Sequence, residues 1–330
     1  MPANRKDEPQ TSPHLRLDIR SMKHLALRLA FPLEILENVA EFLPLQYDAS
    51  RSHPKREAGK VRTIDAPRFL LKRIQRRINE KLLQNLWLPD IIHAYRRGRS
   101  VRSALKPHEG ARFLWVADVR SFYPSISFRA VYKIFSELGC TADVARLLTR
   151  LTTHRHCLPQ GAPTSPLLAN LHMRFSGLAA RLEGIASQHH LAVTVFGDDI
   201  LLSGREPFGG LEEHLTQIIG AVGLRLNTEK TSPVRGPKEQ HMALKLITNS
   251  RGDELNVLRS YRRRLQSLLD LCRRHGPHAL AAVGITKDPR AYLAGKIAFA
   301  KYVNPRNARF EEDPRWTPKT GHTWTPENRP

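Results

Sequence analysis

The chain has few cysteines and no long apolar run. Its three cysteines among 330 residues are scattered, which is too few for a disulfide framework. No stretch approaches the roughly 20 consecutive apolar residues that span a bilayer. The polar start of the chain, MPANRKDEPQTSPH, lacks the apolar core of a secretory signal. These absences predict a cytoplasmic protein that does not associate with a membrane.

Two other signatures are missing from the sequence. It contains no internal repeat and no glycine-rich phosphate loop, so a P-loop or dinucleotide-binding fold has no support. His154, His156 and Cys157 lie close together, but no fourth ligand stands at metal-binding spacing, which argues against a zinc site. The chemistry is therefore expected from other residues.

Acidic residues are scarce relative to basic ones. The chain has 31 Asp and Glu against 53 Lys and Arg, a formal net charge of +22. A protein so basic needs a polyanionic partner, and nucleic acid is the first expectation. An anionic membrane surface is less favoured, because the basic residues are spread over the chain rather than along one amphipathic helix. The hydrophobic content of 41% suffices for one large domain or two or three small ones.

Hydrophobic periodicity predicts alternating helices and strands after a disordered start at residues 1–15. Strands are expected at 61–67 and 113–119, as a hairpin at 191–204, and from 223 to 227. Helices are expected at 33–42, 69–86, 127–153 with a break near Gly139, 166–186, 211–222, and 257–302 with breaks at Gly276 and Asp288. The tail from 304 to 330, with five prolines, has no expected structure of its own.

The helix predicted over residues 69–86 has one apolar and one basic face. The apolar face consists of Phe69, Leu70, Ile74, Ile78, Leu82 and Leu86. Arg73 and Arg76 belong to the basic part. Such a face is either solvated or in contact with nucleic acid, and the charge of this chain keeps both interpretations open.

Two neighbouring acids carry the strongest chemical signal. Asp198 and Asp199 stand in LAVTVFGDDILLSG, where strand-forming residues flank a Gly-Asp-Asp tip. Gly197 and the aspartates predict the tight turn of a hairpin. Two carboxylates at one tip concentrate like charge, which a hard cation such as Mg²⁺ would relieve. For the pair alone, a solvated surface turn is the alternative.

A third acid, Asp118, ends the strand FLWVAD, 80 residues before Asp198. Three carboxylates at strand ends can hold two Mg²⁺ ions about 3.5–4 Å apart, which activates an attacking hydroxyl and stabilises a leaving pyrophosphate. Between these acids, LPQGAPTSPLLANL (158–171) predicts an irregular turn whose polar residues face a substrate before a helix begins. Phosphoryl transfer then requires a fold that brings the three acids together.

These segments, in this order, resemble the reverse transcriptases, and the bacterial retron-type group is the most similar. The matching stretches are VRTIDAPRFLLKRIQRRI, AYRRGRSVRSAL, WVADVRSFYPSI, LPQGAPTSPLLANL, VFGDDILLS, GLRLNTEKT and GKIAFAKYVNP. The Asp-Asp pair alone is a weak signal, LPQG followed by SP is a specific one, and the ordered set covers about residues 55–305.

The resemblance implies an α+β right-hand polymerase fold. Fingers and N-terminal helices would span 16–112, a palm of antiparallel sheet and helices with inserted fingers elements 113–240, and a helical thumb 241–303. The implied enzyme is an RNA-directed DNA polymerase that uses dNTPs to copy part of a structured non-coding RNA into DNA, in antiphage defence. An effector protein would be a further partner.

The family's catalytic roles fall on palm residues of this chain. Asp118, Asp198 and Asp199 would bind two Mg²⁺ ions, assisted by the backbone carbonyl of Val119. Lys230, in NTEKT, would protonate the leaving pyrophosphate as a general acid. A structural salt bridge is the alternative for this lysine.

The family's nucleotide contacts also have counterparts here. Tyr123 matches the aromatic gate that excludes a ribose 2′-hydroxyl, with ordinary core packing as the alternative. Gln160 would contact the incoming nucleotide, and Gly161 would let the backbone approach it closely. Arg62, with Lys60, would hold the triphosphate, a task that suits the forked donors of arginine.

A basic run in the implied thumb would hold RNA backbone, with a solvated helix face as the alternative. Its residues are Arg259, Arg262, Arg263 and Arg264.

The sequence departs from the family at two places. The usual Tyr-Ala before the two aspartates is Phe196 and Gly197 here, which keeps the ring but loses the hydroxyl and loosens the turn. Retron enzymes commonly carry Val-Thr-Gly where this chain has Ala243, Leu244 and Lys245. Polymerase is therefore better supported than retron, and a non-retron defence reverse transcriptase remains the alternative.

Other classes are also open. A non-catalytic nucleic-acid-binding protein with this fold is argued against by the intact acids and Gln160. An RNA-dependent RNA polymerase also uses Gly-Asp-Asp, but Tyr123 argues against it. A group II intron maturase is less expected, because little chain follows the implied thumb.

Overall fold

The computed structural model describes residues 15–48, 51–54, 61–249 and 254–307. Its helices and antiparallel sheets confirm the expected α+β class. The disorder predicted at the start of the chain and in the tail beyond residue 307 concerns segments outside the described residues, apart from Leu15.

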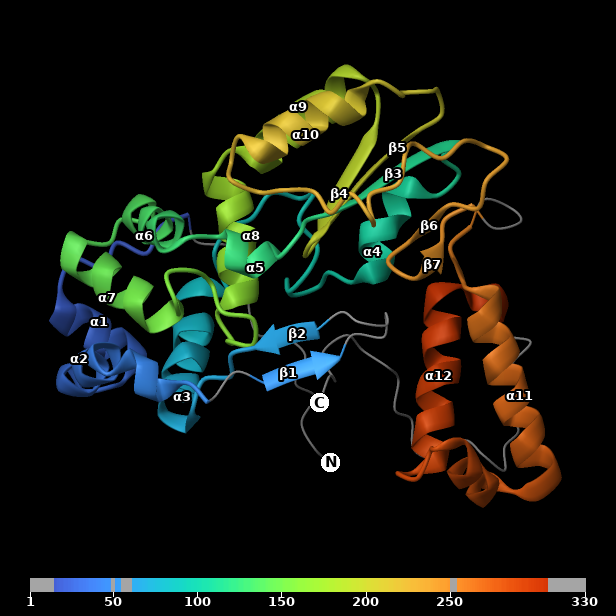
Figure 1. The fold of residues 1–330 in the computed structure, drawn as a ribbon, viewed down its shortest axis with the longest axis horizontal. Coiled ribbons are helices and arrows are strands. Elements are labelled where there is room, and N and C mark those ends of the chain that lie inside the picture. Colours follow the sequence, from blue (N-terminus) through green and yellow to red (C-terminus); the bar gives the residue numbers. More distant parts are fainter. Residues whose placement is uncertain (1–14, 49–50, 55–60, 250–253, 308–330) are drawn as a thin grey trace, which may run out of the picture.

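An antiparallel three-stranded sheet lies at the centre of the fold (Figure 1). In the spatial order β3, β5, β4, its strands are β3 (Phe113–Asp118), β5 (Asp199–Gly204) and β4 (Ala192–Phe196). The central strand β5 is buried along its length after Asp199, which explains its nearly continuous apolar sequence. The sheet is covered on one side by α9 (Leu178–Gln188) and α10 (Leu211–Gly220), and on the other by the short α4 (Val101–Leu105).

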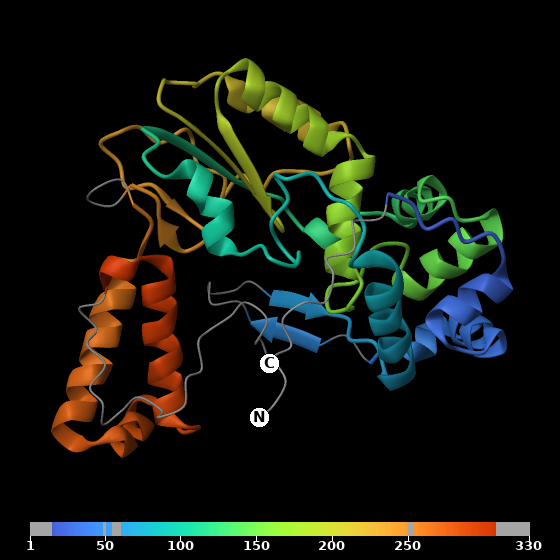
Figure 2. The same ribbon diagram turned by 180° about the vertical axis from the view of Figure 1, so that it is seen from behind.

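A block of helices from two parts of the chain packs beside this sheet. Its members are α1 (Met22–Leu29), α2 (Leu33–Glu41), α3 (Phe69–Ile78), α6 (Phe128–Glu137) and α7 (Ala142–Thr152). Both views show α6 and α7 beside the first three helices, although β3 intervenes in the sequence (Figures 1 and 2). The connecting helices α5 (Phe122–Ser125) and α8 (Ser165–Phe175) share one apolar core with the block and the sheet.

Two smaller elements complete this half of the molecule. The short helix η1 (Leu43–Gln46) leads from α2 to a hairpin of β1 (Arg51–Pro54) and β2 (Val61–Ile64). The strands pair antiparallel, with Arg51 opposite Ile64. The hairpin lies below the end of the sheet at which β5 begins in the view of Figure 1.

The C-terminal part is a helical hairpin that stands apart from the N-terminal helices (Figure 2). A small antiparallel sheet precedes the helical hairpin and consists of β6 (Met242–Ala243), β7 (Leu246–Ile247) and β8 (Asn256–Val257). The helical hairpin itself consists of α11 (Arg259–His275), η4 (Pro277–Val283), α12 (Pro289–Val303) and η5 (Pro305–Asn307). Both predicted breaks are confirmed. Gly276 takes a φ of 81° after α11, and the Asp288 carboxylate accepts a hydrogen bond from the Ala291 amide at 3.0 Å at the start of α12.

Contacts at the C-terminal end of α12 attach this hairpin to α4 and to the segment before β8. Ser100 Oγ and the Tyr302 hydroxyl are 2.6 Å apart, and the Arg102 guanidinium lies 5.6 Å from the Tyr302 ring centroid. The buried Asn304 donates to the Leu255 carbonyl at 2.9 Å. Asn304, which the sequence assigns to the tail, is thus part of the packed structure.

The helix predicted over residues 69–86 is shorter than expected, and its predicted apolar face is confirmed at Ile74, Ile78, Leu82 and Leu86 but not at Phe69. α3 ends at Ile78, and a π-helical turn, η2 (Asn79–Leu83), follows it. In this turn Asn79 Nδ2 donates to the Pro163 carbonyl at 2.7 Å. Phe69, predicted on the apolar face, is 76% exposed and lies 5.5 Å from the Arg73 guanidinium. The first turn of the helix extends past the core, so burial starts at Leu71.

Of the other local predictions, one is confirmed and two are wrong. The pair of helices at 127–153 is confirmed by α6 and α7. The single helix predicted at 166–186 is wrong, because Gly177 takes a left-handed φ of 76° between α8 and α9. The strand predicted at 223–227 is also wrong: this stretch is fully described and contains only one bridge, between Leu226 and Val119.

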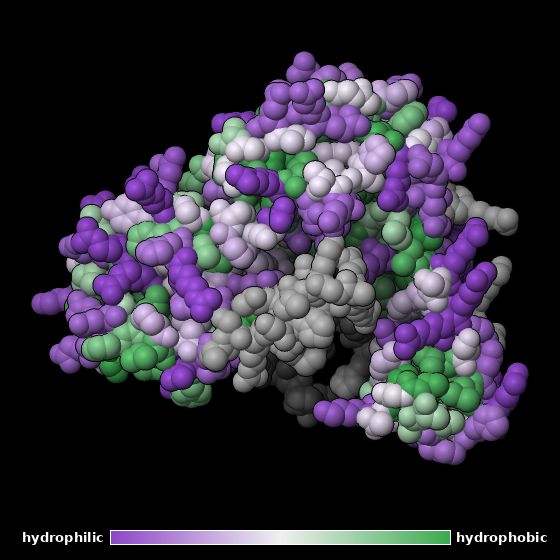
Figure 3. Space-filling view, viewed as in Figure 1, coloured by the Kyte–Doolittle hydropathy of each residue, from purple (hydrophilic) through white to green (hydrophobic). Residues whose placement is uncertain are grey.

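Hydrophilic side chains cover most of the face in Figure 3, and apolar side chains gather at the lower end of the α11–α12 hairpin. Within the described ranges, the helices are all too short or too polar to cross a lipid bilayer.

A buried histidine connects two strands of the palm sheet. His108, in η3 (Lys106–His108), is buried, with Nδ1 2.6 Å from Ser203 Oγ on β5 and Nε2 2.8 Å from Thr194 Oγ1 on β4. Burial lowers its pKa to about 3, and the nearby His93 adds to the shift. The ring is therefore neutral in the folded protein at pH values where it would be protonated in the unfolded chain.

This histidine predicts a loss of stability in mild acid. Its stabilising contribution is complete above about pH 6.5 and falls as the pH drops toward 3, because only the unfolded chain binds the proton. From pH 7 to pH 5 the loss from His108 alone is about 2 kcal/mol. Urea unfolding should show a flatter pH dependence for His108→Gln, despite lower stability at pH 7. Parallel curves for the two proteins would contradict the assignment.

Candidate active site

Strand pairing brings the first acid of the sequence to the later pair. β3 ends at Asp118 and β5 begins at Asp199, and these two residues are direct partners in the antiparallel register. The Val119 amide donates to the Asp198 carbonyl at 2.7 Å, which holds the turn before β5 against the end of β3. Gly197 takes a φ of 67° in that turn, a conformation that favours glycine. All three acids therefore lie at the end of the central sheet where β3 ends and β5 begins, and we call this end of the sheet the carboxylate edge.

The carboxylates at this edge repel one another. Burial raises the pKa of Asp199 to about 7, the charges of Asp198 and Asp118 contribute to the increase, and Lys230 and Lys245 partly offset it. Asp118 is held from two sides: Asn227 Nδ2 donates to its Oδ1 at 3.0 Å, and Lys230 Nζ donates to its Oδ2 at 3.3 Å. The predicted salt bridge of Lys230 is present, at a position beside a proposed metal ligand.

The donor set suits a hard divalent cation, since it consists of carboxylate and backbone oxygens with excess negative charge. Among the described residues, no three His, Cys, Asp or Glu side chains already stand in metal-ligating geometry. The residues at the carboxylate edge therefore fit a divalent cation in the chemistry of their ligand atoms.

A cavity of about 770 Å³ opens in front of Asp118 and Asp198, whereas Asp199 is not among its lining residues. The residues predicted for the site that line it are Asp118, Val119, Tyr123, Gln160, Asp198 and Lys230. Tyr123 also packs against the core, with its ring centroid 5.6 Å from that of Phe122, so packing and cavity lining coexist at this residue.

Gly161 lies against the β1–β2 hairpin. The Asp65 amide donates to the Gln160 carbonyl at 2.8 Å, and Gly161 takes a φ of 127°. A Cβ on Gly161 would lie 2.8 Å from Ile64 Cγ2 and 3.0 Å from the Asp65 carbonyl oxygen. The structure thus gives this glycine a packing requirement that the sequence did not reveal.

One of the two predicted triphosphate ligands, Arg62, lies in the same hairpin. Arg62 is in β2, where it pairs with His53 in the strand register, but its side chain is not among those described. Lys60 lies outside the described residues.

The two basic groups proposed to contact RNA lie on opposite sides of the palm (Figures 1 and 2). Arg73 and Arg76 are exposed on α3, and Arg73 lies 6.0 Å from the Phe31 ring centroid. Along the first turns of α11, Arg259, Arg263 and Arg264 are exposed and Arg262 is half-buried. The structure brings neither group to the acids.

Several cavity residues were not singled out by the sequence. Asn227 was missed although it lies in the matched stretch GLRLNTEKT, because its role depends on Asp118. Tyr95, Ser121 and Arg155 line the same cavity and all have a positive φ, of 56°, 48° and 50°. Strained backbone of this kind concentrates at functional sites and leaves no simple sequence signal.

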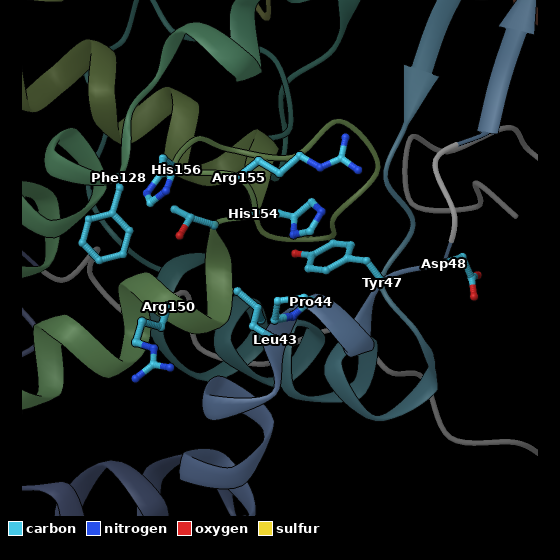
Figure 4. A pocket seen from close by; sticks show the side chains of 10 residues that line it. Leu43, Pro44, Tyr47, Asp48, Phe128, Arg150, His154, Arg155 and His156 are labelled. Atoms are coloured by element: carbon cyan, nitrogen blue, oxygen red, sulfur yellow. The ribbon is translucent and has the colours of Figure 1, made fainter.

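A second cavity, of about 520 Å³, lies behind the turn from His154 to Cys157 (Figure 4). The His154 ring stacks on Tyr47 with centroids 4.1 Å apart, whereas Arg155 Nη1 lies 3.9 Å from Asp65 Oδ1. His154 and Arg155 line both cavities, so this turn is the wall between them. The histidine–cysteine cluster that the sequence weighed as a zinc site is thus a hydrogen-bonded turn, with His154 and Cys157 joined by backbone bonds of 2.9 and 3.1 Å.

An antiparallel sheet with carboxylates at one edge, helices behind it and a helical hairpin beyond it define the palm and thumb of a right-hand nucleic-acid polymerase. The family described as "Reverse transcriptase (RNA-dependent DNA polymerase)" matches residues 53–267. The chain belongs to the reverse transcriptase family, and several curated proteins to which it is similar are bacterial retron reverse transcriptases.

Two relatives illustrate the similarity. The Retron Ec86 reverse transcriptase of Escherichia coli is 30% identical over 217 residues, which cover 65% of this chain and 66% of the relative. The Retron Mx65 reverse transcriptase of Myxococcus xanthus is 29% identical over 275 residues, 77% of this chain and 61% of the relative. The matches thus span somewhat less than two thirds of these relatives' length. The structure of telomerase from Candida albicans in complex with a TWJ fragment of telomeric RNA aligns with a TM-score of 0.45 and 12% identity, over 84% of this chain and 61% of that chain.

The packing of Gly161 predicts a position-specific cost. Gly161→Ala should lower the free energy of unfolding by about 1–3 kcal/mol, because the added Cβ meets β2 in a left-handed backbone. Gly184→Ala is the matched control: this helical glycine has no atom within 4 Å of an added Cβ, so the change should be neutral or slightly stabilising. Equal unfolding midpoints for the two variants would show that the hairpin yields without cost.

Proposed function

We propose that this protein is a retron-type RNA-directed DNA polymerase that copies part of a structured non-coding RNA into DNA. The observation that carries the proposal is the direct pairing of Asp118 with Asp199, which brings three acids together at one end of the sheet, where Asp118 and Asp198 line a cavity. The reaction is attack of a primer hydroxyl on the α-phosphate of a dNTP, with release of pyrophosphate. The RNA would be both template and primer.

Each catalytic role has a candidate in this chain. Asp118, Asp198 and Asp199, with the Val119 carbonyl, would hold two Mg²⁺ ions, which when bound supply charge stabilisation for phosphoryl transfer. Lys230 stands 3.3 Å from Asp118 and would donate a proton to the leaving pyrophosphate.

The remaining contacts would select and orient the nucleotide. Gln160 would contact it from the cavity wall, and Gly161 would keep the adjoining backbone close. Tyr123 would exclude the ribose 2′-hydroxyl. Arg62 and Lys60 would bind the triphosphate.

The subdivision that accompanies this function is fingers at 16–112, palm at 113–240 and thumb at 241–303. The arginines of α3 and α11 would hold the backbone of the RNA and of its DNA product. We further propose a cytoplasmic role in antiphage defence together with an effector protein, which the resemblance of the sequence to retron-type enzymes implies.

Removing one carboxylate should separate activity from stability. Asp199→Asn should reduce dNTP incorporation on an RNA template by about a thousandfold or more, because the charge of the ligand set is lost. The unfolding midpoint in EDTA should not fall, because a like-charge repulsion is relieved. Primer extension and urea unfolding measure the two effects.

The control for this variant is Asp143→Asn, at an exposed aspartate in the first turn of α7, which should retain activity. Full activity of Asp199→Asn would refute the proposed site. A wild-type protein inactive on its own co-purifying RNA, and on every other template, would favour a non-catalytic nucleic-acid-binding protein.

The thumb arginines predict a salt-dependent change in RNA binding. Arg263→Gln with Arg264→Gln should weaken binding and reduce the slope of log K against log salt concentration by about 1 for each phosphate that is no longer neutralised. Arg273→Gln, at the far end of the same helix and ion-paired with Asp270 at 3.3 Å, should leave the slope unchanged. A slope unaffected in both proteins would identify the first turns of α11 as a solvated face.

A further inference from the structure

Tyr95 is an aromatic residue in a strained conformation beside the proposed nucleotide site. It lies in the segment before α4, lines the catalytic cavity and is 53% exposed. Its φ of 56° is a conformation that bulky side chains rarely adopt. A half-exposed ring contributes little to the core, so core packing does not account for the strain.

Two contacts connect Tyr95 to the catalytic machinery. The Tyr123 hydroxyl donates to the Tyr95 hydroxyl at 3.1 Å. A Cβ placed on Gly197 would have Tyr95 Cε2 at 3.8 Å and the Tyr95 hydroxyl at 4.0 Å as its nearest neighbours. Tyr95 therefore lies between the proposed gate and the turn that carries Asp198.

We propose that Tyr95 is a positioning residue that fixes the Tyr123 ring in the orientation required to exclude ribonucleotides. This inference rests on the proposed polymerase function and on the proposed gate. The Tyr123 ring packs against Phe122 with an interplanar angle of 35°, and Tyr123 also lines the cavity. The hydrogen bond to Tyr95 holds the hydroxyl end of the ring, where a small rotation would change the space left for a 2′-hydroxyl.

The residue at position 197 bears on the same contact. An alanine methyl at this position would lie in ordinary van der Waals contact with the Tyr95 ring, as the 3.8 Å distance shows. Because Gly197 has no Cβ, the Tyr95 ring lacks this contact. The orientation of the two tyrosines then depends more heavily on their hydroxyl pair than it would with alanine in the turn.

The test is a double-mutant cycle on nucleotide discrimination. For wild type, Tyr95→Phe, Tyr123→Phe and the double variant, kcat/KM is measured for a dNTP and for the matching rNTP with Mg²⁺ on an RNA template. Each single variant should lower the discrimination ratio about three- to tenfold, the range of one neutral hydrogen bond. The double variant should lose no more than either single variant, since both remove the same bond.

Two further variants separate positioning from structure. Tyr95→Asn removes the ring while asparagine accepts the left-handed backbone, so the unfolding midpoint should hold while discrimination falls at least as far as in Tyr95→Phe. Tyr261→Phe is the matched control, because it removes a tyrosine hydrogen bond of 3.0 Å to the Lys296 carbonyl within the thumb. Its discrimination ratio should equal that of wild type.

The outcomes distinguish this inference from the proposed function. If Tyr123→Ala admits ribonucleotides but Tyr95→Phe and Tyr95→Asn discriminate like wild type, the positioning role of Tyr95 is overturned. If Tyr123→Ala discriminates like wild type, the gate itself is wrong, and the inference falls with it. Additive effects in the double variant would also overturn the inference, because they would mean that the hydroxyls act separately.

Discussion

The pairing of β3 with β5 is the interaction on which this structure depends. The register that sets Asp118 opposite Asp199 also aligns the apolar residues of both strands in the palm core, so a shift of one residue would disrupt the carboxylate edge and the core together. Burial at this edge disfavours charge on Asp199, as its raised pKa shows. The apolar sheet thus stabilises an arrangement of acids that would be unfavourable alone, and it makes that edge suitable for cations and phosphate chemistry.

Unfavourable features gather around one cavity. Its lining includes two of the like-charged acids. It also includes three residues whose backbone has a positive φ: Tyr95, Ser121 and Arg155. Elsewhere the chain is conventional: the helix block and the sheet share one apolar core, and the buried His108 has partners on both ring nitrogens. This distribution is the one expected where well-packed elements hold a strained site in place.

Much of this architecture follows from the sequence. The apolar runs of β3, β4 and β5, the break at Gly276 and the ordered motifs predict the palm and the helical hairpin, because such signals are local. The separation of α8 from α9 at Gly177 was not predictable with certainty, since glycine is tolerated inside helices. The positions of Asn227 and Tyr95 relative to the acids depend on long-range packing, which no local pattern encodes.

The attachments of the C-terminal hairpin have a mechanical consequence. One connection is covalent, through β8 into α11, and the other is the Ser100–Tyr302 hydroxyl pair with Asn304 fastened to Leu255 nearby. The buried side chains of Leu105, Leu114 and Leu201, from α4, β3 and β5, also belong to one apolar cluster with those of α11 and α12. The tilt of the hairpin against the sheet is therefore set by side-chain packing as well as by these two points of attachment.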